Sequence, residues 1–345
     1  MPSKTSAQSM TRRPTISDVA RLANVSISTV SRVLNNSASV AEETTRQVWQ
    51  AIEALEYMPS AAARSLAGRR TGTIALYLPQ TSGAFFASLL QGLEAGVREN
   101  GYDLLIYAHP NVPRNNQQAG LPLGPHNADG LLVFTNCLPD EKIVRLHQRG
   151  YPLLLLFRTP PADVQIPSIN VENKAVTRRL IGHLIEVHGC RRIVFLRGPA
   201  GNEDSAWREK GYREALAAHD IPFDPDLVAQ GNFMPEDARQ AVNALLSSGI
   251  QFDAIFAGDD NAATGAMMAL RQTGRRVPDD VAVVGFDDLS YASALTPPLT
   301  TVRIPLETVG FLASQQLVSL IQTGTAELHI LLPNELVIRQ SCGCP

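Results

Sequence analysis

The chain has 345 residues, 44% of them hydrophobic, so it can bury a substantial core and should contain more than one domain. No apolar run approaches the length of a membrane span, and the N-terminal residues lack the apolar core of a signal peptide. Four cysteines in a chain of this length do not form a disulfide framework. The composition therefore excludes an integral membrane protein and a disulfide-rich secreted domain, and it predicts a cytoplasmic protein with reduced thiols.

Charge is distributed unevenly along the chain. The formal net charge is only −3, but residues 1–70 contain nine basic and five acidic side chains, whereas the remainder contains 21 basic and 28 acidic ones. A basic N-terminal segment on an acidic body is typical of a module that binds a polyanion and is attached to a domain with another task.

Two short helices joined by a tight turn are expected near the N-terminus. Thr15 and Asp18 have the spacing of a capping box that opens the first helix. Asn24 can adopt the left-handed conformation that the turn needs, and Ser26 can cap a second helix that runs through Leu34. Two short helices joined by three residues form a helix-turn-helix.

A third helix should complete this N-terminal domain. Ser39 and Glu42 are spaced as another capping box, and the helix should end near Tyr57, just ahead of a proline. We assign residues 14–58 to a three-helix DNA-binding domain and residues 1–13 to a disordered tail.

Residues 59–71 form a linker. Its first part, PSAAARSLAG, is rich in alanine and has helical propensity, but it has little to pack against and would be marginal as an isolated helix. The basic pair Arg69-Arg70 follows it.

From Thr73 onward, apolar runs alternate with amphipathic stretches. The expected strands are Ile74–Leu78, Leu104–Ala108, Gly130–Phe134, Leu153–Phe157, Ile193–Leu196, Ala254–Ala257 and Val281–Phe286. The expected helices include Phe85–Asn100, Lys174–His188, Trp207–His219, Asp237–Ser248 and Asn261–Thr273. Strands that alternate with helices of this length indicate parallel sheets of the α/β class, and about nine strands favour two doubly wound sheets over one.

Several sequence blocks resemble the lactose/galactose repressor (LacI/GalR) family of transcriptional regulators. The N-terminal part of the resemblance is DVARLANVSISTVSRVLNNSASV at 18–40 with PSAAARSL at 59–66. The later blocks, in family order and spacing, are HLIEVHGCRRIVFLRGP (183–199), WREKGYREAL (207–216), DAIFAGDDNAATGAMMAL (253–270), VPDDVAVVGFDDLS (277–290) and PPLTTVRIP (297–305). The resemblance covers residues 14–345.

The resemblance implies a domain organisation. After the helix-turn-helix domain and a hinge helix in 59–71, a two-lobed domain of the periplasmic-binding-protein type follows. Its N-terminal lobe would comprise residues 72–170 and 303–330, and its C-terminal lobe residues 171–302 and 331–345. One stretch departs from the family, because residues 109–127 contain four prolines and two glycines where the family has a strand and a helix.

The family also implies which residues contact operator DNA. The second helix of the helix-turn-helix enters the major groove, and the residues at base-reading positions are Ile27, Ser28 and Arg32. Arg32 can bond a guanine through two hydrogen bonds, and Ile27 can contact a thymine methyl group. The residues at phosphate-binding positions are Thr15, Thr29, Ser31 and Asn35. The alternative is that all of these residues form the ordinary exposed face of a small helical domain.

The hinge residues that would face the minor groove are Ser60, Ala63 and Leu66. A leucine at the position of Leu66 is inserted between base steps and bends the duplex. The family usually has Asn where Ser60 stands, which alters a hydrogen bond or a helix cap. The alternative for Leu66 is an ordinary apolar linker residue.

Candidate effector-binding residues lie beyond the carboxyl ends of expected strands, where open parallel sheets bind ligands. Asp259 and Asp287 each follow a strand directly, Arg208 follows the loop after Ile193–Leu196, and Phe85 lies beyond the first strand. The strand pattern alone therefore predicts a shared cleft.

The resemblance assigns roles within that cleft. Arg208, Asp259 and Asp287 would bind the polar groups of an effector, and Phe85 and Phe233 would stack on its ring. Carboxylates and a guanidinium can hold several hydroxyl groups of a sugar, and an aromatic face covers its C–H surface. The family more often has Asn at the position of Asp259, and the extra carboxylate argues against an anionic effector.

Each of these assignments has a structural alternative. Arg208 could form a surface ion pair, the aspartates could cap strand ends, and the phenylalanines could belong to the core. Asp260 is expected to be mainly structural, and Trp207 could either line the pocket or pack elsewhere.

Two other function classes fit parts of the sequence. A periplasmic sugar-binding protein shares the two-lobed fold, but the DNA-binding head and the missing signal peptide argue against it. No dinucleotide fingerprint, phosphate-binding loop, zinc-protease motif or serine nucleophile motif is present, so we expect no enzyme and no cofactor, although a carboxylate pair could in principle catalyse sugar chemistry. Cys342 and Cys344 lack the second Cys/His pair that a zinc site needs, so no metal is expected.

The sequence therefore predicts a homodimeric repressor that binds double-stranded, pseudo-palindromic operator DNA. Its operator binding would be gated by a small-molecule effector, a sugar or sugar derivative, with a nucleobase or another small polar metabolite as the alternative. No leucine heptads follow the last block before Pro345, so we expect a dimer rather than a tetramer.

Overall fold

The computed structural model describes residues 14–35, 39–57, 70–108 and 123–345. The chain divides into two compact units, the first ending at Thr71 and the second beginning at Gly72. The hinge residues Ser60, Ala63 and Leu66, and most of the proline-rich stretch 109–127, lie outside the described residues. No helix in the described part of the chain is long and apolar enough to cross a membrane.

The first unit is a three-helix domain. Its helices are α1 (Ile16–Leu22), α2 (Ile27–Asn35) and α3 (Glu42–Ala54), which pack against one another. The small core between them consists of Val19, Ala20, Ala23, Val30, Val33, Val48, Ala51 and Tyr57. These apolar residues recur at helical spacing, which is why each helix buries one face.

The starts of the first two helices follow the sequence prediction. Asp18 accepts hydrogen bonds from the backbone N–H and the hydroxyl of Thr15, at 2.9 and 2.7 Å. Asn24 has φ of 52°, and the Ser26 hydroxyl accepts from the backbone N–H of Thr29 at 3.1 Å. Ser26 therefore ends the turn and caps α2, because its side chain accepts a hydrogen bond from a backbone N–H in the first turn of that helix.

The prediction for the third helix was wrong at both ends. Helix α3 begins after Ala41 without a side-chain cap, so Glu42 stands in the first helical position instead of completing a capping box with Ser39. The helix ends at Ala54, because Glu56 takes a left-handed conformation (φ of 48°) that turns buried Tyr57 into the core.

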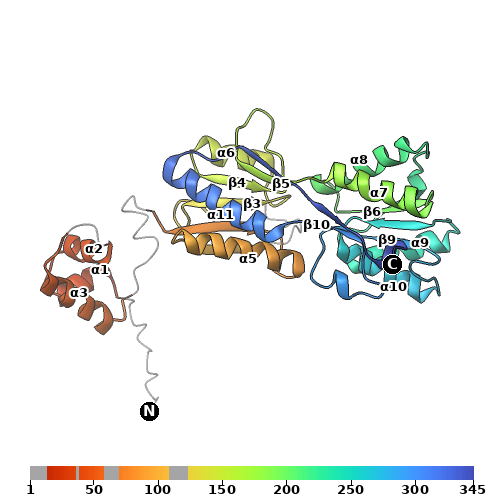
Figure 1. The fold of residues 1–345 in the computed structure, drawn as a ribbon. Helices are drawn as coiled ribbons and strands as arrows, with labels where there is room; N and C mark the ends of the chain where they lie inside the picture. The colour runs from red at the N-terminus through yellow and green to blue at the C-terminus, as the bar shows by residue number, and fades with distance from the viewer. Residues whose placement is uncertain (1–13, 36–38, 58–69, 109–122) are drawn as a thin grey trace, which may run out of the picture. The chain divides into compact units, whose positions relative to one another are not determined.

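The second unit consists of two α/β lobes joined side by side (Figure 1). The first lobe contains a six-stranded parallel sheet in the order β11-β5-β4-β3-β1-β2. Its strands are β1 (Thr73–Leu78), β2 (Asp103–Ala108), β3 (Gly130–Phe134), β4 (Leu153–Leu156), β5 (Ser168–Val171) and β11 (His329–Leu332). Its helices are α5 (Ala84–Glu99), α6 (Asp140–Gln148) and α11 (Leu306–Thr323), and α5 packs against α11.

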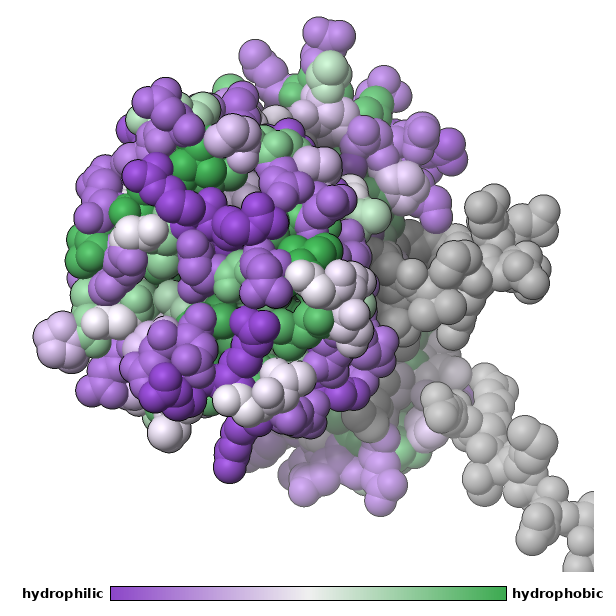
Figure 2. Space-filling model, turned by 90° about the vertical axis from the view of Figure 1, so that its right-hand side faces the viewer, coloured by the Kyte–Doolittle hydropathy of each residue, from purple (hydrophilic) through white to green (hydrophobic). Residues whose placement is uncertain are grey.

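The second lobe contains a four-stranded parallel sheet in the order β7-β6-β8-β9. Its strands are β6 (Ile193–Arg197), β7 (Val228–Gln230), β8 (Ala254–Ala257) and β9 (Ala282–Val284). Its helices are α7 (Lys174–His188), α8 (Glu203–Ala218), α9 (Pro235–Ser247) and α10 (Asp260–Gln272). The pairs α7–α8 and α9–α10 cover opposite faces of the sheet (Figure 1). The face of this lobe seen in Figure 2 is mostly hydrophilic, with small separated hydrophobic patches.

The chain crosses between the lobes three times, after β5, before α11 and after β11. Near these crossings β10 (Thr301–Arg303) pairs antiparallel with β12 (Glu335–Val337). The first-lobe sheet extends slightly beyond the sequence-based boundaries at 170 and 330, since β5 reaches Val171 and β11 reaches Leu332.

Most of the expected strands and helices are present, with shifted ends. The expected strand 281–286 shortens to β9, and the expected helix 207–219 begins four residues earlier as α8. The sequence prediction did not name β5, β7, β10, β11 or β12, which are only three or four residues long and carry no clear alternation of apolar and polar residues.

Candidate functional site

Both sheets direct the carboxyl ends of their central strands to one cavity. In the first lobe β1 lies between β2 and β3, and in the second lobe β6 lies between β7 and β8. At each of these positions the strand order reverses, because successive strands are added on opposite sides of the first one. Open α/β sheets bind ligands at such switch points. A cavity of about 300 Å³ lies there, at the small end of the range for ligand sites.

Loops and helix starts from both lobes line this interlobe cavity. From the first lobe the lining residues are Pro79, Gln80, Phe85, Phe86, Phe134, Thr135 and Asn136. From the second lobe they are Pro199, Asn202, Asp204, Arg208, Asn232, Phe233, Met234, Asp259, Asn261 and Asp287.

All five residues that the sequence suggested for effector binding lie in this lining: Phe85, Arg208, Phe233, Asp259 and Asp287. Trp207 does not line the cavity. It is 42% exposed, its indole N–H donates to Glu203 at 3.3 Å, and Lys210 stands over its ring. Trp207 therefore faces solvent instead of the cavity.

Arg208 is a buried guanidinium held by several partners, so it does not form a surface ion pair. It is 3% exposed, and its Nε donates to Asn173 at 2.9 Å while another nitrogen donates to the Gly258 carbonyl. The guanidinium carbon lies 3.7 Å from the centroid of the Phe286 ring. A terminal nitrogen lies 3.7 Å from an Asp287 oxygen. These contacts fix the side chain in one orientation at the cavity wall.

Asp259 combines two roles. Its Oδ1 accepts from the backbone N–H of Ala262 at 2.8 Å and so caps α10, and its Oδ2 accepts from Asn261 at 2.8 Å. The structural alternative for this residue is therefore realised, although the same carboxyl group also lines the cavity. Burial raises the pKa of Asp259, and these hydrogen bonds, which lower it, offset the rise only in part.

Asp287 differs from Asp259 because one of its oxygens, the one that lies 3.7 Å from Arg208, makes no hydrogen bond to any described residue. Its Oδ1 is buried and accepts no hydrogen bond among the described residues. Its backbone has φ of 110°, which is rare for a residue with a side chain, and its N–H donates to the Val302 carbonyl at 2.8 Å. Burial raises the pKa of Asp287 well above its usual value; Arg208 opposes this rise, and neighbouring aspartates reinforce it.

Thr135 in the first lobe is a second polar group that lacks a hydrogen bond among the described residues, and it was not among the residues predicted from the sequence. Its hydroxyl is buried and has no hydrogen-bond partner in the described structure. It follows Phe134 at the end of β3, so the strand-end rule that identified Asp259 would have identified Thr135 too. Each lobe thus contributes one unsatisfied polar atom to the cavity lining.

Two further acidic groups are Asp204, which also lines the cavity, and Asp260, which does not. Asp204 accepts a hydrogen bond from Asn173 at 2.8 Å, and burial raises its pKa to about 6. Asp260 accepts from the Thr301 hydroxyl at 2.6 Å and from the Leu289 N–H at 2.8 Å, and burial raises its pKa to about 7. Asp260 joins three segments of the second lobe without lining the cavity, as expected for a structural residue.

The aromatic lining is part of a packed cluster. The Phe85 ring lies 5.3 Å from Phe86 and 5.6 Å from Phe157, so it belongs to the core as well as to the cavity. Phe233 packs on Gly198, where an added Cβ would come within 2.2 Å of its ring. The loop after β6 therefore needs glycine at this position if the Phe233 ring is to face the cavity.

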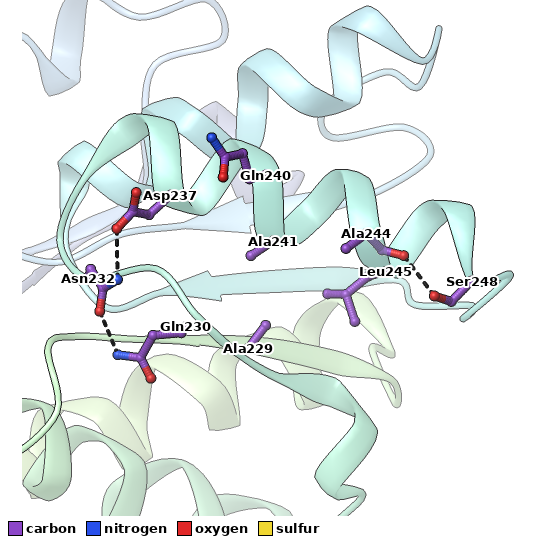
Figure 3. A pocket seen from close by; sticks show the side chains of 9 residues that line it. All are labelled: Ala229, Gln230, Asn232, Asp237, Gln240, Ala241, Ala244, Leu245 and Ser248. Carbon is purple, nitrogen blue, oxygen red and sulfur yellow. Dashed lines mark hydrogen bonds between the residues drawn. The ribbon is translucent and has the colours of Figure 1, made fainter.

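A second hollow of about 470 Å³ lies between β7 and α9 (Figure 3). It is open, and short alanine side chains line much of it. Gln230 donates to Asn232 at 2.8 Å, and Asn232 donates to Asp237 at 2.7 Å. Because these polar groups already satisfy one another, the interlobe cavity is the better candidate for a ligand site.

In the first unit, α2 presents a polar face to solvent. Val30 and Val33 are buried in the core, whereas Ile27 is 50% exposed and Ser28 and Arg32 are exposed. The three candidate base-reading residues therefore share the accessible side of α2, the arrangement that a recognition helix requires.

The candidate phosphate-binding residues differ from one another in hydrogen bonding and burial. The hydroxyls of Thr15 and Thr29 already bond to Asp18 and Ser26, at 2.7 and 2.8 Å. Ser31 is partly buried on α2. The side chain of Asn35 lies outside the described residues.

Comparison with known proteins identifies the family. Residues 15–60 match the bacterial regulatory proteins of the lacI family, and residues 181–342 match the periplasmic binding protein-like domain. The ribose operon repressor of Halalkalibacterium halodurans is 33% identical over 328 residues, which cover 95% of this chain and 96% of that protein. This chain belongs to the LacI family.

Solved LacI-family structures show the same architecture. A complex of the transcriptional regulator CelR with cellobiose is 33% identical, with a TM-score of 0.72 over 95% of this chain and 100% of that one. A lac repressor dimer bound to operator and an anti-inducer is 25% identical, with a TM-score of 0.78 over 96% of this chain and 99% of that one. The chain is thus a transcriptional regulator with a helix-turn-helix domain and a two-lobed effector domain, and not an enzyme.

Proposed function

We propose that this regulator is a repressor whose binding to operator DNA is controlled by an uncharged sugar or sugar derivative in the interlobe cavity. The observation that carries the proposal is the pair of unsatisfied atoms, Asp287 Oδ1 and the Thr135 hydroxyl oxygen, on opposite sides of that cavity. A buried polar atom without a hydrogen bond is unfavourable, and a ligand hydroxyl would supply that bond at both atoms.

The chemistry of the lining favours a polyol over an anion. Three aspartates and one arginine line the cavity, so a negatively charged ligand would meet more carboxyl groups than cations. In the proposed complex Asp287 and Asp259 accept hydrogen bonds from sugar hydroxyls and Arg208 donates them. Phe85 and Phe233 cover the C–H face of the ring.

The two lobes already contact each other near the cavity. The backbone N–H of Thr159, after β4, donates to the Glu203 carboxylate at the start of α8 at 2.7 Å, and the Thr159 hydroxyl donates to the same group. A ligand bound to both Thr135 and Asp287 would add a second connection between the lobes. The effector would thereby favour one lobe arrangement, the two-state element that allosteric control needs.

On the DNA side, Ile27, Ser28 and Arg32 read base edges. The residues that hold phosphates are Thr15, Thr29, Ser31 and Asn35, and the hinge residues that enter the minor groove are Ser60, Ala63 and Leu66. Two chains pair as a homodimer, so that two helix-turn-helix domains reach two halves of a pseudo-palindromic operator. The relative solved with operator is a dimer, which supports this assembly. The protein would act in the cytoplasm of a bacterium, where the chromosome lies.

The decisive experiment is a thermodynamic cycle. Ligands from a panel of mono- and disaccharides, including ribose and cellobiose, and of nucleobases are first screened by thermal shift, since a ligand at 100 times its Kd adds about 2.7 kcal/mol of stability. The ligand found is then titrated into the full-length protein with and without an operator selected from random duplexes.

Linkage requires that the operator changes effector affinity by the same factor as the effector changes operator affinity. We expect a factor of about 5–150. If saturating operator leaves effector affinity unchanged, the protein is not effector-gated. If only nucleobases bind, the sugar assignment is wrong while the gating mechanism stands.

A further inference from the structure

Four metal-ligating side chains, from two segments far apart in the sequence, converge in the second lobe. The expectation that Cys342 and Cys344 lack a second pair of possible ligands was wrong. The fold places His183 and His188 of α7 beside them. One possible ligand atom from each of the four residues lies within 4.8 Å of all the others.

The separations between these atoms match tetrahedral zinc coordination. The Nε2 atoms of His183 and His188 are 3.3 Å apart. Cys344 Sγ lies 3.5 Å from His183 Nε2 and 3.4 Å from His188 Nε2, and Cys342 Sγ lies 3.7 Å from His183 Nε2. Zinc bonds of 2.0–2.1 Å to nitrogen and about 2.3 Å to sulfur, at tetrahedral angles, give about 3.4 Å between two nitrogens and about 3.6 Å between nitrogen and sulfur.

The chain around the cluster is built to hold this geometry. Gly343 has φ of 108°, and an added Cβ there would lie 3.0 Å from the His188 ring, so only glycine lets the Cys-Gly-Cys turn approach His188 this closely. The preceding residue, Ser341, is buried and donates to the Val283 carbonyl at 2.6 Å. The position of the turn on the second lobe is therefore set independently of the four ligands.

The burial of the four side chains would let a metal ion reach the cluster from solvent. Cys342 is buried at 1% exposure, whereas Cys344 and both histidines are partly exposed. An ion can therefore enter from solvent and become largely enclosed. Two thiolates and two imidazoles in a tetrahedral arrangement select zinc among the common divalent metals, and a closed set of four protein ligands is typical of a structural site.

We propose that His183, His188, Cys342 and Cys344 form a structural zinc site that fastens the C-terminal segment to α7. This site is separate from the effector cavity, since none of its residues lines that cavity. Zinc would stabilise the second lobe by tying together segments about 155 residues apart, the sequence separation of Cys344 and His188 being 156.

The test measures metal content in tag-free, full-length protein purified under reducing conditions. Elemental analysis should give about one zinc per chain in the parent and a loss of most of it in Cys344→Ser and in His188→Gln. Both positions are partly exposed, so these variants should fold. The matched control is Cys137→Ser, which changes a buried cysteine of the first lobe and should keep its zinc.

Two further measurements distinguish a four-ligand site from loose binding. Cobalt(II) in place of zinc should give the intense visible bands of a tetrahedral ion and thiolate charge-transfer bands in the near ultraviolet, both weakened in Cys344→Ser. A strong chelator should lower the Tm of the parent and of Cys137→Ser but not that of Cys344→Ser.

Three results would overturn the proposal. The first is a parent with no zinc even after incubation with the metal. The second is equal zinc content in all variants, which would place the ion elsewhere. The third is a Cys342–Cys344 disulfide in the protein purified under reducing conditions, which would show that the thiols pair with each other.

Discussion

The first unit of this regulator exposes its candidate DNA-contacting side chains, whereas the second buries its candidate effector-binding ones. On α2, Ile27 and Arg32 are exposed at a surface with a small apolar core behind it. In the effector domain, Arg208 and Asp287 are at most 5% exposed, and burial shifts the pKa values of four aspartates upward.

This difference follows from the ligands that the two units are built for. A DNA duplex is far larger than the three-helix domain, so it can only be bound on the outside, through contacts that remain accessible to ions. A small effector can be surrounded, and each hydrogen bond to it is then made where water is excluded. The two units should therefore respond differently to salt, substitution and pH.

The largest effect is expected from salt on operator binding. We expect the basic first unit to bind DNA phosphates through exposed cations and backbone N–H groups, and this binding to release counterions from the DNA. For about 6–10 phosphate contacts per dimer, operator affinity should fall about 10³–10⁵-fold between 50 and 200 mM salt. If the effector is the uncharged sugar proposed above, its affinity should change little over that range. Titrations of operator and of effector at several salt concentrations check this, and a flat operator curve would contradict the assignment of the first unit.

Substitution in the cavity should separate the two activities. Asp287→Asn keeps the shape of the side chain but replaces one acceptor oxygen with an NH2 donor, so effector affinity should fall by about 1–3 kcal/mol. Operator affinity without effector should be unchanged. Calorimetric titration of the effector measures the loss, with Asp279→Asn, an exposed surface change, as the control. An Asp287→Asn protein that still binds effector normally would remove this residue from the proposed site.

The opposite result is expected in the first unit. Arg32→Ala should weaken operator binding by about 1–3 kcal/mol and relax discrimination at one base position, while effector affinity is retained. Competition between the operator and its single-base variants measures this discrimination. Equal losses on operator and on random DNA would show that Arg32 contacts a phosphate instead of a base.

The stability of the effector domain should decrease as pH rises from about 4 to about 7. An unfolded aspartate ionises near pH 4, whereas burial raises the pKa of Asp260 to about 7 in the folded chain. Within this range the folded state keeps a proton that the unfolded state has released. The free energy of unfolding should therefore fall by up to about 1.4 kcal/mol per pH unit for this group, and the loss should level off above pH 7.

Denaturant unfolding across this pH range tests the assignment to Asp260. Asp260→Asn should flatten the dependence, while Asp280→Asn should not, because Asp280 is an exposed residue paired with Arg276 and its pKa is lowered. An unchanged slope in Asp260→Asn would mean that other groups, such as Asp204, dominate.

Sequence reasoning worked best where the decisive interactions are local. The turn at Asn24 and the cap at Ser26 depend on residues three or four apart, and both are present. The strand-end rule likewise predicted that Asp259 and Asp287 share one cavity, because parallel strands have their carboxyl ends at the same edge of the sheet. Both residues line that cavity. The cap predicted at Ser39 failed, because the same local pattern can start a helix at more than one residue and packing of the third helix decides between them.

The sequence by itself therefore determined the family, the α/β class, the exposed face of α2 and the candidate residues of the effector cavity. The tertiary structure alone decided which polar atoms in that cavity are left unpaired, as at Thr135 and Asp287. It also brought His183 to Cys342 across 159 residues of sequence. Local hydrogen bonds and strand ends are encoded within a few residues, whereas the partners of a buried polar group or a metal ligand come from whichever distant segments the packed sheets and helices place beside it.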